Sequence, residues 1–349
     1  MKGRIASLAI ALLAAVPTPL VSAQVPASTA SYFAENPRDI ALRQSLRAIA
    51  SRPGMRVGIA VVDLDHGGSA MINADQMFPM ASTAKIAISA TYLSMVETGA
   101  RQLDQRWPMM VPVAEPASLR GPVARVRQGL VYPAEHLMEL SITRSNNEAT
   151  DGLLAAVGGP GSVNAWLAKN GITGQHLDHT MATLVRDDGA VNPVSDFSPR
   201  TATTPRAMVS LLAAIDRGTA LTPASRAVLL DIMTRTITGS TRIRAGLPQG
   251  TIFAHKTGTL NGVTNDVGII RMPDGRHVAL AVFVTGRQPH RAHGQVIASV
   301  ARTVFEAYTG TAVDPNAFEP SVNEPEEGVA AQTTLASAPA NAAAGMTNR

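Results

Sequence analysis

Apolar residues follow strand-like spacing at both ends of the chain. Near the start, residues 56–64 and 69–73 are separated by the turn-forming stretch DHGG, which predicts a β-hairpin. Towards the end, residues 251–258, 263–272 and 276–286 form three further apolar runs, and a Pro-Asp-Gly turn joins the last two. The pattern therefore predicts five strands that come from both ends of the chain.

Helical spacing fills the rest of the pattern. Residues 40–50 and 292–308 are amphipathic, and further amphipathic segments bounded by Gly or Pro lie between them. We expect an α/β (α+β) fold, with a mainly antiparallel five-stranded sheet flanked by helices. An all-α part, at about 83–235, is inserted between the second and third strands. A cleft is expected where the two parts meet.

Both termini differ from this body in composition. Residues 1–23 combine Lys2 and Arg4 with a short apolar run and a small-residue end at Ala23, which is typical of a cleaved signal peptide. Pro17 and Pro19 interrupt the run too early for a membrane anchor. Residues 314–349 are rich in Pro, Glu, Ala, Asn and Thr, which predicts a disordered tail after a catalytic domain at 27–313. We expect a periplasmic or secreted protein.

Charge and cysteine content exclude several classes of protein. The net charge of +4 falls to about +2 without Lys2 and Arg4, and the remaining arginines are scattered without aromatic neighbours. This does not indicate a nucleic-acid binder. The chain has no cysteine, so a disulfide framework is excluded. We expect a monomer without a membrane span.

A serine and a lysine in the stretch FPMASTAK indicate chemistry. If Ser82 opens a helix, Lys85 lies on the same face at i+3, and its amine can reach the serine hydroxyl. A lysine buried there would lose part of its proton affinity and could accept the serine proton. An isolated match of this kind is more often a helix cap beside a surface lysine.

Two further motifs change that balance. Ser145 and Asn147 lie in TRSNNEA between two predicted helices, and Lys256, Thr257 and Gly258 end a predicted strand. Alone, the first pair could be helix caps and Lys256 an edge-strand charge. In this order and with these separations, SxxK, SxN and KTG form the constellation of penicillin-recognising serine enzymes.

The chain resembles the class A serine β-lactamase family over roughly residues 35 to 310. The likeness extends to motif flanks, namely FPMASTAK, LDQR, ITRSNNEA, LDHT, ATTPRAM, TGSTRIRAGLP and HKTGT. The resemblance implies opening of a β-lactam substrate, with Ser82 as the acylated nucleophile and Lys85 as its proton acceptor. Ser145 would pass a proton to the leaving nitrogen.

The resemblance also implies how substrate is held. Asn147 would bind the amide of the substrate side chain. The substrate carboxylate would be bound by Lys256, Thr257 and Thr259, assisted by Arg242, although Arg242 could equally be a surface arginine. The backbone NH groups of Ser82 and Thr259 would form the oxyanion hole.

The segment that resembles the family's omega loop departs from the family. Met181 stands where the family has the glutamate that activates the deacylating water, and Val185 where it has an asparagine. His179 and Thr201 replace a loop-closing arginine and aspartate, and the segment is several residues longer than in the family. Neither Met181 nor Val185 can take a proton from water or position one.

Two hypotheses follow from these departures. In the first, Asp187, Asp188 or Asp196 replaces the missing base, and the protein hydrolyses β-lactams. In the second, deacylation is slow, and the protein is a penicillin-binding D-Ala-D-Ala peptidase or a β-lactam-binding protein that stays acylated.

The remaining polar residues are interpreted as structural. Asn146 replaces the family's usual aspartate, and Glu148 is expected to face solvent. The histidine pairs at 176/179 and 290/293 have H-x-x-H spacing without a third ligand, so they are expected to be solvated. We expect no metal and no cofactor.

Overall fold

The computed structural model describes residues 37–190, 192 and 201–312. Its helices are α1 (Pro37–Ala50), α2 (Lys85–Glu97), α3 (Ala134–Thr143), α4 (Asn147–Ala156), α5 (Pro160–Lys169), α6 (Met181–Arg186), α7 (Pro205–Asp216), α8 (Pro223–Thr234) and α9 (His290–Thr309). Its strands are β1 (Met55–Asp63), β2 (Ser69–Ile72), β3 (Phe78–Pro79), β4 (Arg106–Pro112), β5 (Val126–Pro133), β6 (Gln175–His176), β7 (Ala202–Thr203), β8 (Phe253–Leu260), β9 (Val263–Arg271) and β10 (His277–Gly286). The predicted signal peptide, the predicted tail and Asp196 lie outside the described residues.

The main sheet confirms the predicted fold class. Its strand order is β2-β1-β10-β9-β8, and every pairing is antiparallel. Strands from the two ends of the chain meet where β1 pairs with β10. Segments that carry the SxxK and KTG motifs, which are far apart in sequence, therefore belong to one folded domain.

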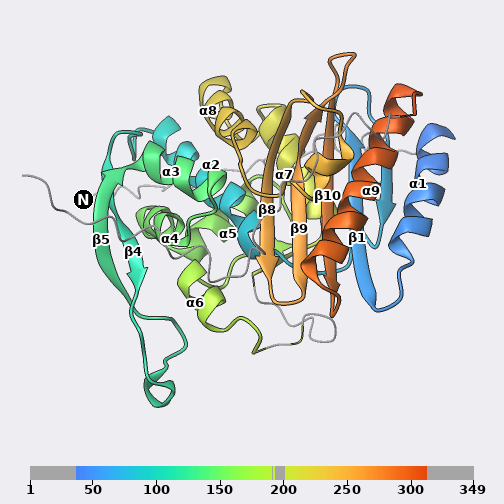
Figure 1. The fold of residues 1–349 in the computed structure, drawn as a ribbon. Coiled ribbons are helices and arrows are strands. Elements are labelled where there is room, and N and C mark those ends of the chain that lie inside the picture. Colours follow the sequence, from blue (N-terminus) through green and yellow to red (C-terminus); the bar gives the residue numbers. More distant parts are fainter. Residues whose placement is uncertain (1–36, 191, 193–200, 313–349) are drawn as a thin grey trace, which may run out of the picture.

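Apolar residues cover both faces of this sheet. Val57, Ile59 and Val61 of β1 belong to one core cluster, together with residues of α1 and α9. Ala60 and Val62, which alternate with them, belong to the other cluster, with residues of α2 and α7. In Figure 1, α1 and α9 lie against one face of the sheet and the inserted helices occupy the opposite side. Burial on both faces explains the nearly continuous apolar runs of these strands.

The inserted part is mostly but not wholly helical. It also contains the two-stranded sheet of β4 and β5 and the small sheet β3-β7-β6, neither of which the apolar spacing predicted. Strand β5 is mostly exposed, so the burial alternation that usually reveals a strand is absent. None of the described helices combines the length and apolarity needed to cross a membrane.

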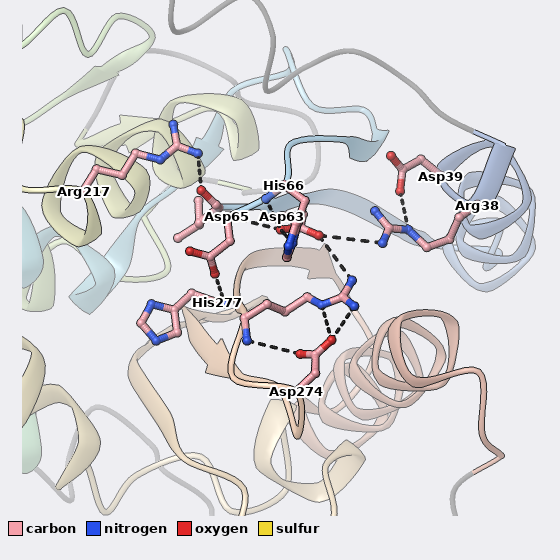
Figure 2. A network of polar contacts seen from close by, with 10 residues as sticks. Arg38, Asp39, Asp63, Asp65, His66, Arg217, Asp274 and His277 are labelled. Atoms are coloured by element: carbon pink, nitrogen blue, oxygen red, sulfur yellow. Dashed lines mark hydrogen bonds and ion pairs between the residues drawn. The ribbon is translucent and has the colours of Figure 1, made fainter.

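A polar network fastens α1 to the sheet at the side away from the β4–β5 sheet (Figure 2). The buried carboxylate of Asp63, at the end of β1, accepts hydrogen bonds from the NH groups of Asp65 and His66. It also lies 3.7 Å from the Arg38 guanidinium of α1 and 3.5 Å from that of Arg276. These contacts satisfy a buried charge and fix the N-terminal helix.

Candidate active site

The candidate nucleophile lies on a tight turn at the start of a buried helix. Ser82 belongs to the 3-10 turn Ala81–Ala84, which runs directly into α2, as predicted. Ala81 adopts a left-handed φ of 50°. The side-chain amide of Asn265, on β9, donates to the carbonyl oxygens of Pro79 at 2.9 Å and Met80 at 3.2 Å. The sheet therefore fixes the position of the turn that carries Ser82.

Strand β8 approaches this turn closely because residue 258 is glycine. A Cβ atom at Gly258 would lie 2.7 Å from the Met80 carbonyl oxygen and 3.2 Å from the Ala81 Cβ. No larger residue fits without moving one of the two segments. The glycine of the KTG motif thus allows β8 to lie beside Ser82.

The side chain of Lys85 joins the first two motifs. Its fully buried amine donates to the Asn147 side-chain oxygen at 2.7 Å and to the Ser145 backbone oxygen at 2.6 Å. It also lies 3.2 Å from the Ser145 hydroxyl oxygen. Ser145 presents these atoms from the loop between α3 and α4, in a left-handed conformation with φ of 56°. The lysine is therefore held by polar contacts within the protein interior.

Burial lowers the pKa of Lys85 well below that of an exposed lysine. Repulsion from the Lys256 ammonium lowers this pKa further, and the carboxylate of Asp151 partly offsets the effect. The lowered pKa favours the neutral amine more than in an exposed lysine, and a neutral amine can accept a proton. This is the electrostatic environment that the sequence predicted for Lys85.

The third motif meets the second at the Ser145 hydroxyl. The buried amine of Lys256 donates to Ser145 Oγ at 2.9 Å and to the Thr257 carbonyl oxygen at 2.9 Å. Ser145 Oγ thus lies within hydrogen-bonding distance of two lysine amines. The structure brings all three motifs into one connected polar cluster.

Arg242 is part of this site rather than a surface residue. It is 5% exposed, and its guanidinium donates to Thr259 Oγ1 at 2.6 Å and to the Asn265 carbonyl oxygen at 2.9 Å. The hydroxyl of Thr257 shares a hydrogen bond with Thr238 at 2.6 Å. The polar groups of β8 are therefore held in place from the segment that precedes the strand.

The segment that resembles an omega loop presents an apolar surface to the nucleophile. Met181, Leu184 and Val185 of α6 line a small cavity of about 10 Å³ together with Ser82, Asn147 and Thr259. The space is about the size of a single water site. We call Met181, Leu184 and Val185 the apolar wall. No aspartate or glutamate is among the described residues that line this cavity.

Asp151, which none of the sequence motifs indicated, holds the apolar wall in place. This residue is 4% exposed, and its two carboxylate oxygens accept from the NH groups of Met181 at 2.7 Å and Ala182 at 2.8 Å. Burial raises the pKa of Asp151 to about 6, against the opposing effects of these two bonds and of Lys85. Its spacing of i+4 from Asn147 on α4 was the available signal, because it places both on one helix face.

Two of the three proposed substitute bases have other partners. Asp187 pairs with the neighbouring Arg186 at 2.8 Å. Both oxygens of Asp188 accept from the Asn261 NH, at 2.9 and 3.1 Å, in the turn between β8 and β9. Asp188 thereby links the end of the α6 segment to the β8–β9 turn.

Three expectations about surface residues need correction. Glu148 is only partly exposed, and burial raises its pKa. His293 is fully buried, and with His290 it lies within hydrogen-bonding distance of Thr264 Oγ1, because the start of α9 packs against β9. His176 and His179 are partly buried rather than solvated. Among the described residues, no group of three or more His, Cys, Asp or Glu side chains could hold a metal ion.

Together, an antiparallel sheet with an inserted helical part and a Ser–Lys pair beside a second serine and lysine define a serine hydrolase of the penicillin-recognising type. Comparison with known proteins agrees. The model of the "Beta-lactamase enzyme family" matches residues 41–308. The chain therefore belongs to the β-lactamase enzyme family, and its relatives place it with class A.

Three similar proteins illustrate this relationship. The extended-spectrum β-lactamase PER-1 of Pseudomonas aeruginosa is 30% identical over 316 residues, covering 85% of this chain and 99% of the relative. A solved structure of a variant of the last common ancestor of Gram-negative bacteria class A β-lactamase is 32% identical with a TM-score of 0.65, covering 77% of this chain and 99% of the other. A PBP-A mutant, solved as an acyl-enzyme complex with penicillin G, is 30% identical with a TM-score of 0.64, covering 78% and 97%.

Proposed function

We propose that this protein is a secreted serine hydrolase that opens β-lactam rings through an acyl-enzyme on Ser82. The observation that carries the proposal is the connected cluster beside Ser82, in which Lys85 and Lys256 both reach the Ser145 hydroxyl. Family membership supports the same reaction. No metal or cofactor enters the proposed mechanism.

In the acylation step, the neutral amine of Lys85 takes the proton of the Ser82 hydroxyl, and the serine oxygen attacks the lactam carbonyl carbon. The lowered pKa of Lys85 supports this role. When the lactam C–N bond breaks, Ser145 gives its proton to the ring nitrogen. Lys256, 2.9 Å from Ser145 Oγ, stabilises the negative charge that develops there.

Substrate binding uses the polar groups around the same cavity. Lys256, Thr257 and Thr259 bind the substrate carboxylate, and Arg242 adds positive charge through its contact with Thr259. Asn147 accepts or donates to the amide of the substrate side chain. The backbone NH groups of Ser82 and Thr259 bind the developing oxyanion.

The residues available for the deacylation step support a second candidate function. The apolar wall offers no group that can take a proton from water on the α6 side of the cavity. This observation favours a slow second step, as in a penicillin-binding D-Ala-D-Ala peptidase or a β-lactam-binding protein. The PBP-A structure, described as an acyl-enzyme complex with penicillin G, is consistent with that alternative.

Location and assembly are proposed from the sequence. The sequence of residues 1–23 supports export to the periplasm or the exterior, and the composition of residues 314–349 supports a disordered tail behind a catalytic domain at 27–313. We propose a monomer as the working state.

Stopped-flow hydrolysis of a chromogenic cephalosporin by the purified protein, with Ser82→Ala as control, tests the proposal. Sustained turnover that the variant lacks would support a β-lactamase. A burst of about one equivalent followed by very slow turnover would support the second function. A signal that Ser82→Ala does not remove would contradict both, because each requires the same acyl-enzyme.

A further inference from the structure

Exposed apolar side chains gather on one projecting part of the molecule. Within the described residues, nine large hydrophobic side chains are exposed, and six of them lie between residues 113 and 131. The most exposed are Leu130 at 68%, Leu119 at 67% and Val123 at 57%. We call residues 113–131 the arm. Scattered exposed hydrophobics are normal on soluble proteins, but a concentration of this kind indicates an interaction surface.

The arm is also positively charged. It contains the exposed arginines Arg120, Arg125 and Arg127, and its sole acidic residue is Glu115. The Glu115 side chain is only 3% exposed and pairs with Arg125 and Arg186 at 3.8 Å each. The outer surface of the arm therefore presents cations and apolar groups without an exposed carboxylate.

The arm has a fixed root. Strands β4 and β5 are paired along their length, from Arg106 opposite Pro133 to Pro112 opposite Val126. Beyond them, the Ala124 NH donates to Thr183 Oγ1 on α6 at 3.0 Å. Figure 1 shows the connection between the two strands extending away from the sheet, past α6. The protein thus holds the exposed side chains outward.

We propose that the arm docks on an anionic phospholipid surface, as a peripheral contact rather than a membrane span. Leu119 and Val123 flank Arg120 and Pro122 at the outer end, where apolar groups can enter the headgroup region while arginines contact lipid phosphates. Charge complementarity selects this partner. A second copy of the chain would bring the same arginines face to face, which is repulsive.

The arm residues that the test changes lie outside the cavity at Ser82, so these variants should leave the reaction intact. None of Leu119, Arg120, Val123 and Arg125 lines the cavity at Ser82. A failure of the docking proposal is therefore distinguishable from a failure of the hydrolase proposal. The reaction of each variant with the chromogenic cephalosporin in solution, measured as hydrolysis or as acylation of Ser82, checks that the variant is folded.

The test is flotation of the full chain with vesicles of phosphatidylcholine alone or mixed with phosphatidylglycerol. We expect binding to the mixed vesicles only, weakened by added salt. Arg120→Gln with Arg125→Gln should lower the partition coefficient about 25-fold, since each arginine near an anionic surface contributes roughly fivefold. Leu119→Ser with Val123→Ser should also lower it.

The matched control replaces an exposed apolar residue and an exposed arginine elsewhere on the surface. Ile252 is 50% exposed and Arg271 is exposed near it, so Ile252→Ser with Arg271→Gln should leave vesicle binding unchanged. Equal binding of the arm variants and the native protein, or no binding by the native protein, would overturn the proposal. So would a dimer in sedimentation that the arm variants abolish while vesicles remain unbound, because the surface would then belong to a second copy.

Discussion

Replacing Gly258 by alanine tests whether the close approach of β8 to the Ser82 turn sets the rate of acylation. The added Cβ would lie 2.7 Å from the Met80 carbonyl oxygen, about 0.7 Å closer than the 3.4 Å at which ordinary van der Waals contact begins. The Met80 carbonyl oxygen is a backbone atom that accepts a hydrogen bond from the Asn265 side chain, so it is not free to move away. The strain must therefore move the turn, the strand or both by several tenths of an ångström.

The expected effect is a loss of rate together with a moderate loss of stability. A misplacement of about 1 Å at a reacting group can lower the rate by about 10²-fold, so a shift of about 0.7 Å predicts a loss of at least tenfold in acylation. Overpacking of this kind destabilises a fold by about 1–3 kcal/mol. Single-turnover acylation by a chromogenic cephalosporin and urea unfolding measure the two quantities separately.

Two other glycines provide controls. Gly161, on α5, has open space around its missing Cβ, so alanine there should stabilise the helix by up to about 1 kcal/mol without changing the rate. Gly268, within the sheet, would place a Cβ 2.3 Å from the Ala254 carbonyl oxygen, so alanine there should reduce stability. If Gly258→Ala acylates at the native rate, or no more slowly than Gly268→Ala, the reasoning about the turn is wrong.

Three further changes address the residues around the cavity. Arg242→Ala should lower kcat/KM for a β-lactam at least tenfold. Thr259 Oγ1 would lose its 2.6 Å hydrogen bond, and the buried Asn265 carbonyl oxygen would lose its 2.9 Å hydrogen bond from the guanidinium. Arg242→Lys tests whether a positive charge alone restores kcat/KM. Asp188→Ala should change turnover less than fivefold, because the Asp188 carboxylate is bound to the Asn261 NH. If the variant instead acylates normally and fails to deacylate, Asp188 is the missing base. For Asp151, whose folded pKa is raised to about 6 from 3.8, the folded state binds the proton more tightly than the unfolded state. The stability contribution of this group is therefore full below pH 3.8 and is lost as pH rises through about 6, a change of about 3 kcal/mol. Asp151→Asn should lack that slope in urea unfolding measured from pH 4 to 7, and an identical slope in both proteins would show that another group causes it.

The elements that the sequence predicted well are those whose burial produces a regular pattern of apolar residues. Strands β9 and β10 are buried along nearly their whole length, and their apolar runs and Pro-Asp-Gly turn predicted both. Strands β4 and β5 were missed because β4 is only partly buried and contains prolines, while β5 is mostly exposed and contains a glycine. Strand β4 also packs against α4, which lies elsewhere in the chain.

Within the site, the motifs predicted the residues but not their support. Lys85, Ser145 and Lys256 form the cluster that the motif order indicated, and Ser82 lines the cavity beside it together with Asn147. Asp151 and Asn265 were missed, because a buried polar residue within a helix or strand looks in sequence like a surface residue. Burial of Arg242 was likewise undecided until its contacts with β8 and β9 were visible.

The contacts of Asp151 connect the two steps of the proposed reaction. One carboxylate fixes the apolar wall through the NH groups of Met181 and Ala182, and the same charge raises the proton affinity of Lys85. Protonating Asp151 would remove that charge and lower the pKa of Lys85 further, while it weakens the bonds that hold α6. A change that leaves acylation intact must therefore preserve Asp151. Substitutions at Leu184 or Val185, whose backbone NH groups Asp151 does not bind, can alter deacylation alone, because both line the cavity at Ser82 and Lys85 does not.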